Sequence, residues 1–129
     1  MGEHDPNRFL ERWAERVIDR DLDGLLALYD RSAVLIPTFS NRLLCGHERI
    51  REYFERLCSR EDLRISLHER PRVATAIDGG LQALAGIYRW RFAVDGEPLA
   101  FEARFSFLLD LARPSPILHH HSSQIPRTL

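Results

Sequence analysis

The spacing of hydrophobic residues changes once along the chain, from a helical period to a strand-like alternation. Near the N-terminus, Phe9, Trp13 and Val17 recur every four residues, which places them on one face of a helix. Asp5 is a suitable N-cap for this helix, and Pro6 suits its first position, where a backbone N–H is not needed. The pattern predicts an amphipathic helix that begins near residue 6.

Two further helices are predicted downstream of the first. The short segment 21–30 carries apolar residues at Leu22, Leu25, Leu26 and Tyr29. The segment 46–58 directs Ile50, Tyr53, Phe54 and Leu57 to one face. Between these two segments, residues 33–39 form an apolar run that is typical of a strand.

From Leu63 onward the apolar residues follow a strand-like pattern. The strand-like segments are 63–77, 81–94, 99–111 and 116–126. The turns "DGG" at Asp78 and "DGE" at Asp95 are hairpin signals. This order predicts a single α+β domain over residues 1–129, with N-terminal helices packed in a strongly curved, mixed or antiparallel sheet.

Composition narrows the range of partners. The chain has 129 residues, of which 44% are hydrophobic and 29% are charged, and its formal net charge is −1. This balance is typical of a folded globular domain and provides no net field that would attract nucleic acid or a membrane surface. All 18 positively charged residues are arginine, which is the better partner for carboxylates in buried ion pairs.

Several other classes of protein lack support in the sequence. Cys45 and Cys58 are too few for a disulfide framework and have no metal-ligand spacing. The N-terminal residues do not resemble a secretory signal, and no apolar stretch approaches the roughly 20 residues of a membrane span. We therefore expect a cytoplasmic protein that has no cofactor and contacts neither membranes nor nucleic acid.

Three consecutive histidines stand on the last predicted strand. Side chains alternate across a strand, so His119 and His121 share one face and His120 points to the other. The three therefore cannot form a metal cluster by themselves, and a zinc site would need a further ligand such as His68 or Glu102. Nucleophilic catalysis by a serine is also disfavoured, because strand residues two apart diverge and no nucleophile elbow is present. The favoured interpretation is the wall of a pocket.

Arginines occupy the middle of two aromatic-rich strands. Alternation places Arg89 opposite Tyr88 and Trp90, and it places Arg104 opposite Phe105. A guanidinium that is buried there must meet a carboxylate or a bound anion. Two alternatives stay open. In the first, each arginine is paired internally, with Glu102 for example, or is simply exposed on one sheet face. In the second, the arginines line an anion pocket.

The order of elements resembles the nuclear-transport-factor-2-like superfamily, a cone-shaped fold that also includes ketosteroid isomerase. Within it, the segments "AVLIPTFSN", "YFERL", "GIYRWRF", "ARFSF" and "HHHSSQIP" resemble the calcium/calmodulin-dependent protein kinase II association domain and its free-standing bacterial relatives. The resemblance spans nearly the whole chain. It departs at Ile50, where the kinase domains have a pocket histidine.

The resemblance implies an oligomerisation module with a cavity for a small, carboxylate-like anion. The residues expected to contact the ligand are Arg89, Arg104, His119, His121 and Tyr53, although Tyr53 is also well placed to be a core residue. The expected partner is a second copy in a homodimer or larger homo-oligomer, formed through an apolar face of the sheet that the helices leave uncovered. The alternative is a small isomerase or dehydratase that uses a pocket histidine as its base and Arg104 as an electrophilic donor.

Overall fold

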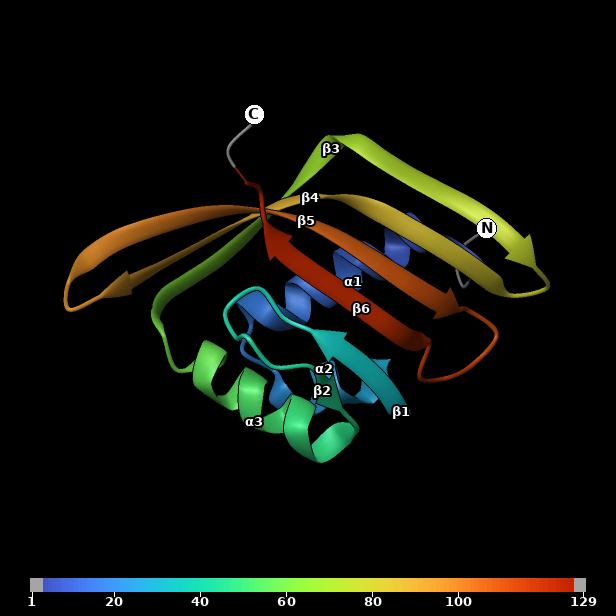
Figure 1. Cartoon of the computed structure of the whole chain (residues 1–129), viewed down its shortest axis with the longest axis horizontal. Coiled ribbons are helices and arrows are strands. Elements are labelled where there is room, and N and C mark those ends of the chain that lie inside the picture. Colours follow the sequence, from blue (N-terminus) through green and yellow to red (C-terminus); the bar gives the residue numbers. More distant parts are fainter. Residues whose placement is uncertain (1–3, 127–129) are drawn as a thin grey trace.

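The computed structural model describes residues 4–126, which form helices packed in a strongly curved sheet (Figure 1). In chain order the elements are α1 (Pro6–Ile18), α2 (Leu22–Leu28), β1 (Tyr29–Ile36), β2 (Leu44–Cys45), α3 (His47–Cys58), β3 (Glu61–Asp78), β4 (Leu81–Val94), β5 (Glu97–Asp110) and β6 (Ile117–Gln124). The predicted α+β cone is confirmed. No helix in this part of the chain is long and apolar enough to cross a membrane.

The first helix begins as its sequence indicates. Asp5 is the N-cap, and its side chain accepts a hydrogen bond from the backbone N–H of Asn7 at 2.9 Å. The second helix is shorter than predicted. It ends at Leu28 because Tyr29 is extended and pairs with Ile117, so Tyr29 belongs to a strand.

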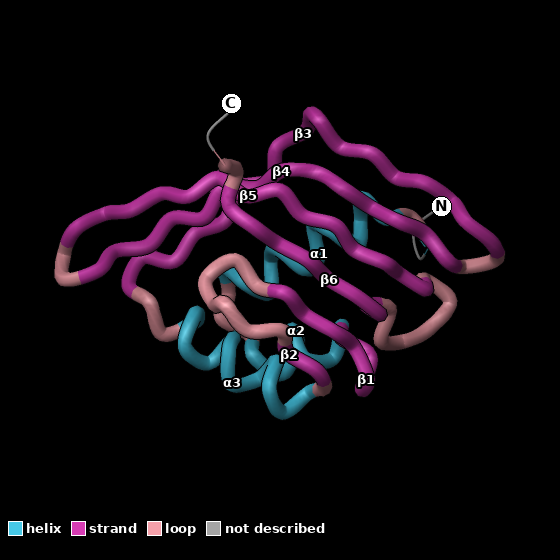
Figure 2. Tube along the Cα trace, viewed as in Figure 1, coloured by secondary structure: helices cyan, strands magenta, loops and turns pink. Residues whose placement is uncertain are grey.

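The six strands form one mixed sheet in the order β2-β1-β6-β5-β4-β3 (Figure 2). Strands β1 and β6 pair in parallel, and every other neighbouring pair is antiparallel. The last strand therefore lies in the interior of the sheet, with both edges hydrogen-bonded. Any side chain on β6 is held in place by neighbours on either side.

The two long hairpins turn where the sequence predicts. Asp95 and Gly96 both have positive φ, at 51° and 78°, which is the conformation that a two-residue type I′ turn requires. Gly79 has φ 54° in the turn between β3 and β4. Glycine adopts this conformation without the steric cost that other residues bear.

The core lies between α1 and the sheet. Trp13 is fully buried, and its ring contacts those of Tyr88 (5.5 Å, stacked), Trp90 (6.0 Å) and Phe107 (5.7 Å). Figure 1 shows α1 behind the sheet, against its inner face, and the outer face of the sheet is turned toward the viewer. This inner face carries the aromatic residues of β4 and β5, so the alternation that was read from the sequence is confirmed.

The outer face of the sheet consists of the alternate residues. Register places side chains in rows across the strands, and one row runs Val73, Ala85, Ser106, His121 and Ile36. Directly paired residues share a face of the sheet, so these five side chains project together. Val73 is 59% exposed. The outer face is therefore a partly apolar surface that the helices do not cover within residues 4–126.

The core account predicts the effect of truncating its central residue. Trp13→Ala should lower the free energy of unfolding by about 3–5 kcal/mol, because neighbouring side chains cannot fill the volume of the lost indole. Ile18→Ala, at the end of the same helix and 40% exposed, should change it by about 0.5 kcal/mol or less. Urea unfolding followed by circular dichroism measures both. Equal losses in the two variants would contradict this placement of the core.

Candidate functional site

The interior of the cone is occupied by a buried histidine. His120 is 2% exposed, and its ring stacks on Phe107 with centroids 3.9 Å apart. Tyr29 Oη lies 2.9 Å from His120 Nδ1, and Tyr88 Oη lies 3.2 Å from Nε2. Both ring nitrogens therefore have a partner within the core.

The indole of Trp13 determines which group donates in each hydrogen bond of this network. Trp13 Nε1 can only donate, and it donates to Tyr29 Oη at 3.2 Å. His120 Nδ1 is the partner left to accept the proton of Tyr29 Oη, so we assign this proton to that bond. The assignment leaves the histidine proton on Nε2, which donates to Tyr88 Oη. Burial raises the pKa values of Tyr29 and Tyr88 above the ordinary range, so both hydroxyls keep their protons.

The network continues to the loop after β1. The Tyr88 hydroxyl hydrogen-bonds with the side chains of Ser122 and Thr38. The hydroxyls of Ser122 and Thr38 also hydrogen-bond with each other. A cavity of about 10 Å³ remains beside them, which is about the size of one water molecule. The deep cone therefore has no room for a ligand larger than this.

The expected placement of the flanking histidines is wrong. His121 is exposed and His119 is half-buried, and both belong to the outer face, whereas His120 is the one that points inward. The reason is the register of β6: His120 pairs with Phe107, an inner-face residue, so its neighbours must face outward. Ser122 follows His120 onto the inner face.

The expected placement of the strand arginines inside the cone is also wrong. Arg89 and Arg104 are both exposed on the outer face, which helices do not cover, so neither guanidinium needs a buried partner. Within the described chain neither forms an ion pair. Glu102 instead lies 2.8 Å from His68 Nε2, so the internal pair with Glu102 is not formed. Arg104 and His121 both line a hollow of about 430 Å³ on the outer face.

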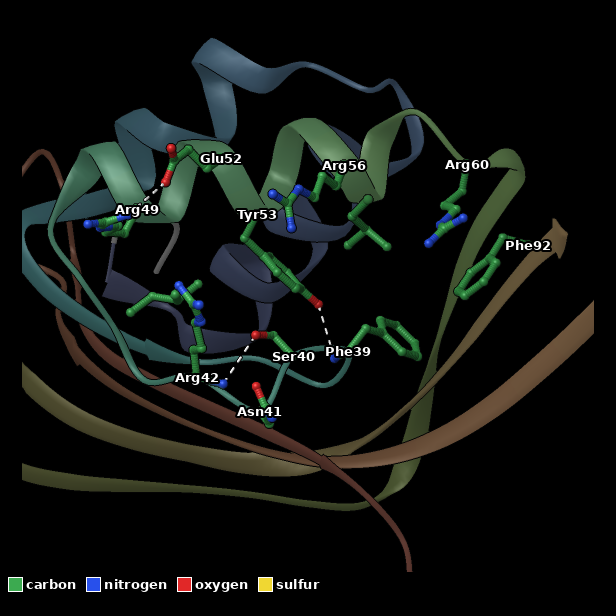
Figure 3. Close-up of a pocket in the computed structure, with 12 residues that line it drawn as sticks. Phe39, Ser40, Asn41, Arg42, Arg49, Glu52, Tyr53, Arg56, Arg60 and Phe92 are labelled. Atoms are coloured by element: carbon green, nitrogen blue, oxygen red, sulfur yellow. Dashed lines mark hydrogen bonds and ion pairs between the residues drawn. The ribbon is translucent and has the colours of Figure 1, made fainter.

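A large cavity lies at the mouth of the cone, between α3 and the loop that follows β1 (Figure 3). Its volume is about 720 Å³, within the range of small-molecule sites. The lining residues come from the loop, α3 and the end of β4: Phe39, Ser40, Asn41, Arg42, Leu44, Arg49, Glu52, Tyr53, Arg56, Leu57, Arg60 and Phe92. Of the five residues expected to contact a ligand, only Tyr53 lies here.

Tyr53 forms the floor of this cavity. Its hydroxyl accepts a hydrogen bond from the backbone N–H of Phe39 at 3.4 Å, and Figure 3 shows this bond below the ring. Burial raises the pKa of Tyr53, so the hydroxyl is neutral. Tyr53 also lines the small deep cavity, and it therefore separates the mouth from the buried histidine.

The charge of the pocket lining is strongly positive. Four lining residues are arginine, and Glu52 is the sole acid among them. Glu52 is engaged by Arg49, at 3.5 Å between Oε1 and a guanidinium nitrogen. The guanidinium carbon of Arg60 lies 5.7 Å from the centre of the Phe92 ring, within cation–π range. Such a lining attracts anions.

The sequence contains a periodic signal for two of these arginines. Arg49 and Arg56 lie seven residues apart on one face of α3, whereas Arg60 follows the end of this helix at Cys58. The face that Arg49 and Arg56 share with Tyr53 could have been found by projecting the third helix. Arg42, on a loop, has no such periodic signal.

In residues 4–126 no three His, Cys, Asp or Glu side chains come together in a way that could hold a metal ion.

Comparisons with known proteins agree with the fold. A family model described as SnoaL-like domain matches residues 7–128. The crystal structure of a Xanthomonas campestris protein, named as a candidate calcium/calmodulin-dependent protein kinase II association domain, matches with a TM-score of 0.82. That protein is 24% identical, and the match covers 93% of this chain and 85% of that one, which shows a shared fold. No curated protein gives a significant match.

The buried histidine makes stability depend on pH. Burial lowers the pKa of His120 from 6.5 to about 3, with smaller contributions from His119 and His121. Between these two pH values the unfolded chain binds a proton that the folded chain excludes. Stability should therefore fall as the pH falls through this window, by up to about 1.4 kcal/mol per unit.

Replacing the histidine tests this directly. His120→Phe loses the two hydrogen bonds to tyrosine and should be less stable at pH 7. Its stability should nevertheless change less than that of the parent protein between pH 6.5 and 4, because the other titrating groups are common to both. Urea unfolding at several pH values measures the difference. Parallel pH profiles would show that His120 is not a neutral core residue.

Proposed function

The chain belongs to the SnoaL-like domain family, and we propose that it is a non-catalytic homodimerisation module that binds a small anion in the pocket at the mouth of the cone. The observation that carries this proposal is the lining of the pocket, with four arginines and a single carboxylate that already contacts one of them. Guanidinium groups bind carboxylates and phosphates through paired, charge-assisted hydrogen bonds. The pocket has the charge and the volume for such a ligand.

The same geometry disfavours the isomerase or dehydratase alternative. An enzyme of that kind needs a base within hydrogen-bond reach of its substrate. His120 is bonded on both sides, and its pKa of about 3 makes it a weak base. Tyr53 stands between it and the mouth. Glu52, the acid in the pocket, contacts Arg49 and has no histidine beside it in the lining.

The outer face of the sheet supports the assembly part of the proposal. Val73, Ala85 and Ile36 lie in one row across it, and Ile87 lies on the same face beside Arg104. An exposed apolar surface of this kind is typical of a protein interface, and a two-fold axis brings the same surface of two copies together. The Xanthomonas campestris protein with the same fold is named as an association domain.

Anion binding should stabilise the folded chain. Benzoate at a hundredfold excess over its dissociation constant should raise the free energy of unfolding by about 2.7 kcal/mol. Arg56→Met should abolish this stabilisation, because it removes a pocket guanidinium while keeping most of the side chain's bulk. Arg104→Met, on the outer face, should retain it. Unfolding at matched protein concentrations, with and without benzoate, gives the comparison.

The opposite pattern of losses in the two variants would place the anion on the outer face of the sheet. If Arg104→Met loses the benzoate effect and Arg56→Met keeps it, the anion binds on the outer face. If Arg56→Met and Arg104→Met both keep the full benzoate effect, the anion binds in neither place and the pocket is excluded as its site.

Dimerisation should depend on the outer face. The parent protein should be a dimer at micromolar concentration, and Ala85→Asp should be a folded monomer, because it places a charge directly beside Val73 on this face. Ala112→Asp is the matched control, since Ala112 is exposed in the turn after β5. Light scattering after size exclusion measures the mass. A monomeric parent protein, or a dimeric Ala85→Asp, would exclude this interface.

A further inference from the structure

The arginine pocket has two ends with different chemistry. In Figure 3, Arg42, Arg49 and Arg56 lie around the ring of Tyr53, whereas Arg60 lies beside Phe92 on the other side of the view. Arg42 comes from the loop after β1, Arg49 and Arg56 from α3, and Arg60 follows the end of α3. Positive charge is therefore present at both ends of the cavity.

The charge at the first end exceeds what the protein itself neutralises. Glu52 contacts Arg49, but the contact is long, at 3.5 Å, and both side chains are more than half exposed. Exposed pairs of this kind contribute little to stability. Within the described chain Arg42 and Arg56 form no ion pair. These two guanidinium groups are free to bind an acid group.

The second end combines charge with an aromatic surface. Phe39 and Phe92 meet edge to face, with ring centres 5.3 Å apart, and Arg60 lies over Phe92. Leu57 is nearly fully buried and also lines this cavity. An arginine held over an aromatic ring keeps its N–H groups available at the edge of the guanidinium plane. Phe39, Phe92 and Leu57 therefore give this end an apolar surface against which an apolar part of a ligand can pack.

We propose that the ligand of this pocket is a diacid, with two anionic groups held apart by a rigid apolar body. This proposal rests on the proposed anion binding and specifies its ligand class. One acid group binds Arg42 and Arg56, the apolar body lies against Phe39 and Phe92, and the second acid group binds Arg60. A single carboxylate leaves one end of the pocket unneutralised, and a flexible diacid loses conformational entropy when it is held extended.

Three probes separate these elements of recognition. Terephthalate has two carboxylates on a planar ring, benzoate has the ring with one carboxylate, and adipate has two carboxylates on a flexible chain. Calorimetry at low ionic strength should show terephthalate binding on the order of tenfold more tightly than benzoate, which is the effect of one further charge-assisted contact. Terephthalate should also bind more tightly than adipate.

Two variants assign the acid groups to the two ends. Arg60→Met should collapse the preference for terephthalate over benzoate to about one, because the second acid group loses its partner. Arg56→Met should weaken both ligands. Arg12→Met, exposed on α1 and outside the pocket lining, should keep the full preference. Circular dichroism confirms that each variant is folded.

The outcomes distinguish the two proposals. If benzoate binds as tightly as terephthalate, or if Arg60→Met keeps the preference, the ligand is not a diacid, although anion binding in the pocket stands. If adipate matches terephthalate, the rigid apolar body is excluded. If none of the three probes binds the parent protein, the anion-binding function itself fails.

Discussion

The alternation of side chains along β6 is the constraint on which the rest of the structure depends. Because the strand lies in the interior of the sheet and its register is fixed on both edges, one of its three histidines must enter the core. His120 enters, stacks on Phe107 and is bonded by two tyrosines. A polar ring is tolerable there because each of its nitrogens has a partner.

This burial determines where function can reside. With the imidazole, the tyrosines and Trp13 filling the cone, the remaining deep cavity is about 10 Å³. Space for a ligand remains at the mouth, where α3 presents arginines over Tyr53. The same alternation sends His119, His121 and the strand arginines outward, onto the surface that we assign to dimerisation. The alternation along β6 thus places one histidine on the inner face of the sheet and the other two on its outer face.

Much of this architecture is predictable from the sequence, and the failures have a common cause. The helices, the hairpin turns and the separation of Arg104 from Phe105 all follow from local periodicity. Local periodicity does not determine which face of a sheet the helices cover. Helices that pack on one side of the sheet bury only one of its two faces. Burying the aromatic face removes more apolar area from water than burying the arginine face, so the helices cover the aromatic face. The pocket arginines depend on how α3 meets a loop, which is a tertiary contact.

The protonation state of His120 tests the central claim most directly. Long-range ¹H–¹⁵N NMR spectra of the histidine rings, recorded from pH 8 to pH 5, distinguish the neutral tautomers from the charged ring. The account predicts that His120 remains neutral throughout, with its proton on Nε2, because Trp13 donates to Tyr29 and Tyr29 donates to Nδ1. A His120 ring that becomes charged near its ordinary pKa, or that carries its proton on Nδ1, would contradict it.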